Sequence, residues 1–200
     1  MNKCIITIGR EFGSGGHEIG KRLAQSLKIP FYDREILTLT AQEGDMKESD
    51  IAENEEQMPV GRLFQLSMRA PFNPPVTDEV FVLQQSAIKK LAQNGPCVIV
   101  GRCADFVLRD EDIVRVFISA DMPYKIARKR MVAPENCEYS EEEMRKYINE
   151  VNENRRKYYE YHTRSKWGHS EHYDLCIRTD HLGVDGAVRV ILAYLENARA

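Results

Sequence analysis

Ile5-Ile6-Thr7-Ile8-Gly9-Arg10-Glu11-Phe12-Gly13-Ser14-Gly15-Gly16-His17-Glu18-Ile19-Gly20 is the stretch of sequence that decides the fold of this chain. A β-branched run ends in a glycine-rich turn, and apolar residues then recur at a spacing of four, at Ile19, Leu23 and Leu27. This pattern predicts a strand, a loop and a helix in direct succession. Amide groups in such a loop, together with the positive end of the helix, form a concave site for anions such as phosphate.

The loop lacks one residue that a phosphate-binding loop is expected to have. In the pattern G-x-x-x-x-G-K-[ST] a lysine follows the last glycine, whereas here Gly15 is followed by Gly16 and His17. A catalyst built on this loop therefore needs a positive charge from another position.

The overall composition is that of an ordinary globular domain. The chain has 200 residues, 42% of them hydrophobic and 30% charged, so we expect one domain with a full core. A net charge of −3 and a pI near 6.0 argue against a general nucleic-acid binder. No apolar run approaches the roughly 18 residues of a membrane span, and no membrane partner is expected.

The start of the chain and its cysteines indicate a reducing cytoplasm. The first residues run directly into a strand, which leaves no room for a signal peptide. The five cysteines are an odd number and include no C-x-x-C pair, which favours reduced thiols.

Strands and helices alternate along most of the sequence. We expect strands over residues 3–8, 29–33, 97–100, 113–119 and 174–177. Helices are expected over residues 16–27, 34–43, 77–94, 121–131, 140–161 and 185–197, with a short one ending near 108. This alternation predicts a parallel, doubly wound α/β sheet. Ligands bind such sheets at the carboxyl ends of the strands, where Asp33 and Gly101-Arg102 stand.

The segment from Gly44 to Pro75 differs from the rest of the chain. It is acidic and weakly apolar, and it ends in Pro71-Phe72-Asn73-Pro74-Pro75. We interpret it as a flap inserted over the edge of the sheet. A solvated connection is the alternative.

Several short segments together point to a family. Ile6-Thr7-Ile8, Gly13-Ser14-Gly15 and Phe31-Tyr32-Asp33 have the spacing found in nucleoside monophosphate kinases, cytidylate kinases above all. Gly101-Arg102 resembles the G-R-D segment of those enzymes. The run G-R-E-F-G-S-G-G and the late segments 157–163 and 172–177 resemble the cytidylate kinase-like subgroup, over nearly all of the chain.

The resemblance implies a three-layer α/β fold of the P-loop NTPase type. It implies one domain over residues 1–200, with an acceptor flap at about 44–75 and a helical lid at about 131–160. The implied activity is phosphoryl transfer from ATP, with Mg²⁺, to a small acceptor, first of all a nucleoside monophosphate. The expected ATP-binding residues are Gly13, Ser14, Gly15, Gly16, His17 and Glu18.

Arginines are the expected source of the missing positive charge, because phosphoryl transfer depends chiefly on positioning and on cations near the transferred oxygens. Laid on a loop of the form G-P-S-G-A-G-K-G-T, Gly16 takes the place of the lysine and Arg10 that of the first glycine. Arg10 is the leading replacement because its guanidinium can bind two phosphate oxygens; His17 is second. A surface arginine paired with Glu11 is the alternative. The other expected catalytic residues are Arg102, Arg130 and Arg155.

Glu18 falls at the position of the loop threonine. It is a candidate ligand for a Mg²⁺ ion or its water, since carboxylates suit that metal. An acidic residue favoured by the helix dipole is the alternative.

The acceptor side departs further from the family. Asp33, Arg34, Arg102 and Asp105 are the expected acceptor-binding residues, although Arg34 replaces the family's serine and Cys103 the acid of G-R-D. Asp105 is either a replacement acid or only an acid in the first turn of a helix. Two other functions therefore stay open: a nucleotide- or anion-binding module without catalysis, and a kinase for a non-nucleotide acceptor.

Overall fold

The computed structural model describes residues 4–33, 35–44, 76–132 and 139–198. Within these residues five parallel strands form one sheet in the order β2-β3-β1-β4-β5. The strands are β1 (Ile5–Arg10), β2 (Phe31–Tyr32), β3 (Cys97–Val100), β4 (Ile113–Ser119) and β5 (Leu175–Arg178). All five were expected from the sequence. However, β1 ends two residues later than predicted, because Gly9 and Arg10 still pair with Phe117 and Ile118 of β4.

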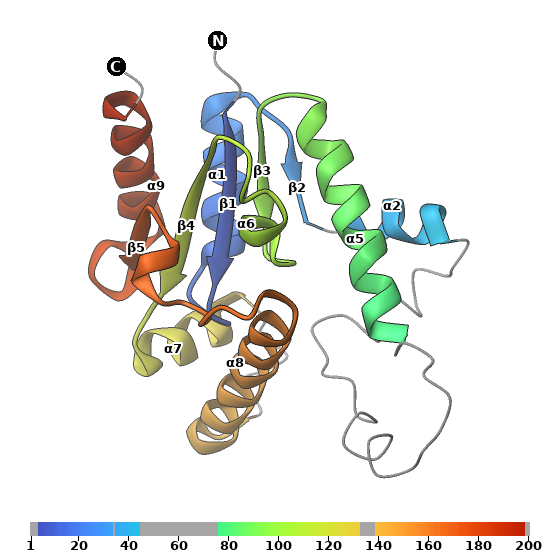
Figure 1. Cartoon of the computed structure of the whole chain (residues 1–200). Helices are drawn as coiled ribbons and strands as arrows, with labels where there is room; N and C mark the ends of the chain where they lie inside the picture. The colour runs from blue at the N-terminus through green and yellow to red at the C-terminus, as the bar shows by residue number, and fades with distance from the viewer. Residues whose placement is uncertain (1–3, 34, 45–75, 133–138, 199–200) are drawn as a thin grey trace, which may run out of the picture.

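Helices cover both faces of the sheet (Figure 1). On one face, α1 (Gly16–Leu27) and α9 (Thr179–Asn197) pack on Ile6 and Ile8 of β1. On the other, α2 (Glu35–Gly44), α5 (Val76–Gln93) and α6 (Ala104–Val107) pack on Ile5 and Ile99. Alternate side chains of a strand point to opposite faces, so the uniformly apolar strands serve both cores. The three-layer α/β fold is confirmed.

Two further helices lie beyond the carboxyl ends of the strands, at the lower end of Figure 1. These are α7 (Met122–Val132) and α8 (Glu141–Thr163). They pack on each other through Ile126, Met144 and Ile148. As predicted, Ser140 begins α8 with a capping box, in which Ser140 and Glu143 bond each other's backbone amides.

The last helix begins earlier than the sequence predicts. α9 starts at Thr179 rather than Asp185, with a kink at Gly183 (φ 63°). The first turn is held by Thr179, which is fully buried and donates to the carbonyl of Ser14 at 2.8 Å. This contact between distant segments has no signal in the local pattern.

The strand order fixes where a site can form. β1 leads through α1 to β2 at one edge, whereas β4 leads through α7 and α8 to β5 at the other. Connections that diverge from neighbouring strands leave a crevice at their carboxyl ends. None of the described helices is long and apolar enough to cross a membrane. Arg34 and residues 45–75 of the expected flap lie outside the described residues, as do residues 133–138 of the expected lid.

Candidate functional site

The loop after β1 has the backbone of an anion site. Gly13 and Gly15 adopt φ values of 83° and 90°, a region that glycine enters without steric cost. The first intrahelical bond of α1 runs from the amide of Ile19 to the carbonyl of Gly15. The amides of residues 16–18 therefore precede the helical ladder and, with the positive end of α1, can receive an anion.

The Arg10 side chain lies directly against two glycines. A Cβ added to Gly16 would lie 2.5 Å from the Cβ and 3.1 Å from the Cγ of Arg10. One added to Gly101 would lie 2.0 Å from Nη1 of Arg10. Arg10 thus runs from the end of β1 across Gly16 to Gly101, after β3. A side chain at position 16 and the arginine at position 10 cannot both be present without a backbone shift.

A cavity of about 420 Å³ opens above the loop. Three elements bring positive charge to its lining: Arg10 from β1, Arg128 and Lys129 from α7, and Arg155 from α8. The loop glycines and His17, Glu18 and Asp33 complete the polar wall. The structure thus brings together most of the residues predicted for the phosphate loop.

Helix α8 docks against the loop through two side chains. Asn152 Oδ1 accepts a hydrogen bond from the amide of Phe12 at 2.7 Å. Arg155 donates from Nη1 to the carbonyl of Arg10 at 3.4 Å, and its guanidinium lies 5.6 Å from the centre of the Phe12 ring. Arg155 therefore reaches both the loop and the cavity above it.

Glu18 is held between two arginines. Its Oε1 accepts from Nη2 of Arg22 at 2.5 Å, and its Oε2 accepts from Nη2 of Arg128. A metal ion would have to compete with these cations for the carboxylate. The role of Glu18 as a metal ligand stays a prediction that this arrangement does not favour.

Arg130 lies apart from the phosphate loop. It donates from Nη2 to the carbonyl of Tyr139 at 3.2 Å and is not part of the cavity lining. Its catalytic role also stays a prediction, whereas its neighbours Arg128 and Lys129 face the cavity.

Asp33 joins the loop to the acceptor side. Its Oδ2 lies 2.8 Å from Nδ1 of His17, and its carbonyl accepts from Nε of Arg102 at 3.1 Å. Burial would raise the pKa of the Asp33 carboxyl. The hydrogen bond from His17 and the charges of Arg10 and Arg102 outweigh burial, so the pKa is lowered and the group is ionised at neutral pH.

Arg102 is buried beside Asp33 in an unusual backbone turn. Burial, with the charge of Arg10, lowers its pKa to about 10, so it keeps its charge at pH 7. Gly101, Arg102 and Cys103 have successive φ values of 76°, 56° and 54°. Left-handed backbone costs roughly 1–2 kcal/mol for a non-glycine residue and occurs preferentially at functional sites.

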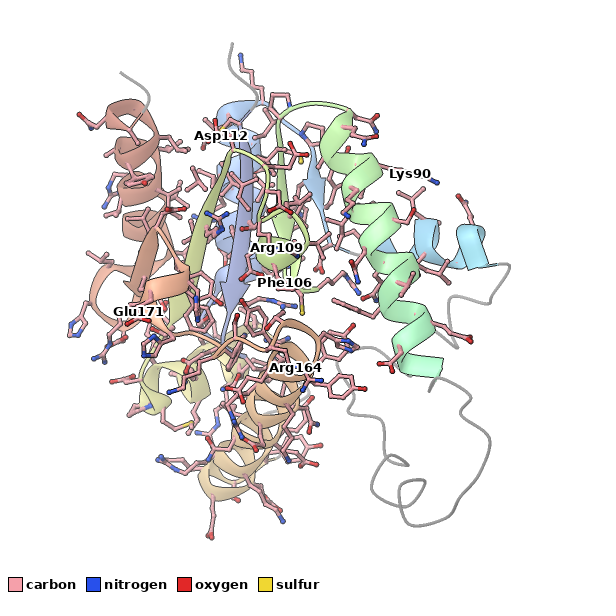
Figure 2. The ribbon with its side chains drawn as sticks, in the orientation of Figure 1. Lys90, Phe106, Arg109, Asp112, Arg164 and Glu171 are labelled. Atoms are coloured by element: carbon pink, nitrogen blue, oxygen red, sulfur yellow. The ribbon has the colours of Figure 1, made fainter. Side chains whose placement is uncertain are left out.

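Asp105 lines a small cavity together with Arg102. It is buried, and its Oδ2 accepts from the hydroxyl of Tyr159 at 2.7 Å. Burial raises its pKa, and the Tyr159 hydrogen bond opposes that shift in part. Asp105 also lines a separate cavity of about 330 Å³, together with Phe106 of the short α6 and Arg109 just after it, two side chains that Figure 2 labels. An acceptor-binding role for it stays a prediction.

Sequence reasoning left several site residues without a role. Residues 125–130 include four basic residues, but this pattern does not say which of them face the loop. Lys125 is buried and binds Glu11, with Nζ 2.6 Å from Oε2. Arg128 and Asn152 contact the site only because α7 and α8 fold back over it.

The family comparison agrees with this geometry. A model described as the cytidylate kinase-like family matches residues 5–181. The chain belongs to the cytidylate kinase-like family. This membership confirms the resemblance inferred from the loop and the late segments.

Solved structures of other proteins share the fold of this chain. An uncharacterised protein from Eubacterium ventriosum ATCC 27560 is 29% identical, with a TM-score of 0.73 and coverage of 98% of this chain and 99% of that one. A shikimate kinase from Bacteroides thetaiotaomicron is 16% identical (TM-score 0.58, coverage 96% and 98%). A shikimate kinase from Acinetobacter baumannii, in complex with shikimate, is 13% identical (TM-score 0.52, coverage 98% and 94%). The two shikimate kinases show the fold alone, that of P-loop kinases. No curated protein matched the sequence.

Proposed function

We propose that the protein transfers a phosphoryl group from ATP to a small-molecule acceptor, with Arg10 in place of the loop lysine. The contact between Arg10 and Gly16 carries this proposal. A standard loop has glycine at its first position and lysine at its seventh, whereas this chain has Arg10 and Gly16 at those positions. A Cβ added to Gly16 would lie 2.5 Å from the Cβ of Arg10. Relative to a standard loop, the positively charged residue and the glycine have exchanged positions, and these two positions are in contact. The loop therefore keeps a positive charge.

The described residues fit a triphosphate. The amides of residues 16–18 and the α1 dipole would bind phosphate oxygens. Arg10 and Arg155 line both the loop cavity and a small inner cavity beside Gly101 and Arg102. Preorganised cations between a donor and an acceptor site stabilise charge that develops on a transferred group. A bound Mg²⁺ ion would add further positive charge there; we assign no described residue to it.

Two acceptor classes are consistent with this proposal. The family resemblance favours a nucleoside monophosphate, which Arg102 would contact. A non-nucleotide acceptor is the other class, as the departures at Arg34 and Cys103 suggest. A binding module without catalysis is the alternative function.

Arg10→Ala tests the proposed role of Arg10. Because a charged hydrogen-bonding group is lost from the phosphate site, ATP affinity or turnover should fall at least tenfold, about 1.4 kcal/mol. Titration calorimetry with a non-hydrolysable ATP analogue and Mg²⁺, together with ADP formation over a panel of acceptors, measures both quantities.

The matched control is Arg145→Ala, which removes an exposed arginine on α8 whose partner is Glu141 at 3.3 Å. This variant should behave as wild type. If Arg10→Ala also does, Arg10 is not the replacement cation. Tight nucleotide binding with no turnover of any acceptor would favour the binding module.

A further inference from the structure

His17 is held by contacts on two sides at the edge of the phosphate cavity. Its Nδ1 lies 2.8 Å from Oδ2 of Asp33, and its ring meets the Phe31 ring edge-on, with centroids 5.2 Å apart. The His17 side chain is 60% exposed, whereas that of Asp33 is 18% exposed. Because Nδ1 is engaged by Asp33 and the largely exposed ring lines the cavity, Nε2 is the ring nitrogen left for a ligand.

The carboxylate decides which nitrogen of a neutral imidazole carries the proton. A carboxylate accepts only, so Asp33 selects the form of His17 with a proton on Nδ1 and a lone pair on Nε2. A histidine whose tautomer and orientation are set by a buried carboxylate is the arrangement that serves as a general base in hydrolases. Arg10 lines the same cavity.

We propose that His17, oriented by Asp33, is the general base that deprotonates a hydroxyl group of the acceptor, and hence that the acceptor is an alcohol. This inference rests on the proposed phosphoryl transfer. An alcohol must lose a proton as its oxygen attacks, whereas the oxygens of a monophosphate are already ionised near neutral pH. A hydrogen-bonded base next to the loop has a chemical task only with the first kind of acceptor.

Nε2 of His17 takes the proton of the acceptor hydroxyl as that oxygen bonds to the γ-phosphorus of ATP. The bond from the γ-phosphorus to the β–γ bridging oxygen breaks, and ADP leaves with that electron pair. The exposed imidazolium then gives its proton to water. Asp33 touches none of the reacting atoms and is a positioning residue.

The pH dependence of this step reflects all charged groups around His17. Arg10 and Arg102 approach Asp33 from the ends of β1 and β3, and Glu35 accepts a hydrogen bond from the Asp33 amide at 3.1 Å. The other charged groups of the cavity and of the first turns of α1 are Glu11, Glu18, Lys21, Arg22, Arg128, Lys129 and Arg155.

Acceptor panels give the first test. The protein, ATP and Mg²⁺ are incubated with a set of nucleoside monophosphates and with a set of unphosphorylated sugars, polyols and hydroxy acids, and ADP formation is measured. The proposal expects turnover in the second set. Turnover confined to the monophosphates overturns the alcohol assignment while leaving the proposed function intact. No turnover in either set overturns both.

His17→Ala tests the base itself. General-base catalysis contributes about 10²- to 10⁴-fold, so kcat with the alcohol should fall by that factor while the KM for ATP changes little. Added imidazole should restore part of the rate, because the site is open to solvent. His169→Ala is the matched control, since His169 lies 3.7 Å from the carboxylate of Glu171 and lines no described part of the phosphate cavity. An unchanged kcat, or a loss that imidazole does not reverse, overturns the role of His17.

Asp33→Asn tests the positioning role with a readout that needs no ligand. Nitrogen NMR of ¹⁵N-labelled histidine should show His17 of the wild type protonated on Nδ1 at pH 8, and a shift toward the Nε2–H form in Asp33→Asn. The pH dependence of kcat should change in the same variant. A tautomer that is the same in both proteins overturns the orientation by Asp33.

Discussion

His162 shows how burial alone changes the chemistry of a residue. Its ring stacks on Phe81 of α5 with centroids 3.9 Å apart, and the rings of Tyr158 and Tyr161 pack against it at 4.5 and 4.8 Å. Desolvation in this aromatic cluster lowers the pKa of His162 to about 4. Its imidazole therefore stays neutral in the folded protein at neutral pH and acts as one more stacked ring.

This shift predicts a pH-dependent stability. Because the folded-state pKa lies below the unfolded value of 6.5, the unfolded chain binds more protons between about pH 6.5 and 4. The free energy of unfolding should therefore decrease as the pH falls through this range. The decrease should be smaller in His162→Phe, which keeps the stacked ring and removes the group that binds the proton. Urea unfolding at pH 7.5, 6.5, 5.5 and 5.0 measures the slope.

The control for this slope is His169→Phe, because His169 is exposed. That variant should follow the wild type at every pH. Equal slopes for the wild type and His162→Phe between pH 6.5 and 5.0 would contradict the prediction.

At the scale of elements, α8 links the core to the phosphate loop. Its capping box begins the helix, Asn152 and Arg155 contact the loop in the middle, and the buried Tyr158 and Tyr159 anchor its end beside Phe81 and Cys103. The sequence predicts the start and length of this helix from local signals. It does not predict that Asn152 bonds the amide of Phe12, 140 residues earlier.

Asn152→Ala should loosen the loop without unfolding the protein. The hydrogen bond to the Phe12 amide is part-buried, and its loss should cost about 1 kcal/mol. We therefore expect the affinity for an ATP analogue to fall severalfold in calorimetry, with a small change in Tm. Asn154→Ala is the control, since Asn154 is exposed on the same helix. Equal affinities for the two variants would exclude the link between α8 and the loop.

The whole molecule places three segments around one side chain. The order β3-β1-β4 sets the end of β1 beside Gly101 after β3, and α1 returns so that Gly16 covers the base of Arg10. A lysine at position 16, as in a standard loop, and the arginine at position 10 would therefore occupy the same space. For this reason the two positions are coupled.

A double substitution tests this coupling. Gly16→Lys alone should be destabilised and inactive, because the Cβ of Arg10 is fixed by the backbone and overpacking costs roughly 1–3 kcal/mol. Combined with Arg10→Gly, it should regain stability and nucleotide binding, since the cation and the glycine then stand as in a standard loop. Thermal unfolding and calorimetry of both single variants and the double variant give the interaction energy. Strictly additive effects would show that the two positions do not share space.

The sequence by itself determined the layers of the fold and the place of the phosphate loop. Those features follow from local physics: β-branched runs, helical spacing, caps, and glycines where the backbone turns left-handed. It also identified Arg10 as the candidate cation, because the position of the missing lysine can be counted along the chain.

The tertiary structure alone decided which charged side chains meet. His17 joins Asp33 because β2 lies beside the first turn of α1, and Glu18 is held by Arg128 because α7 returns over the loop. These contacts depend on strand order and helix packing between segments far apart in the sequence. The pattern of residues along the sequence determines which face of each helix or strand is buried. The distance between two polar atoms on different elements is set only when those elements pack together.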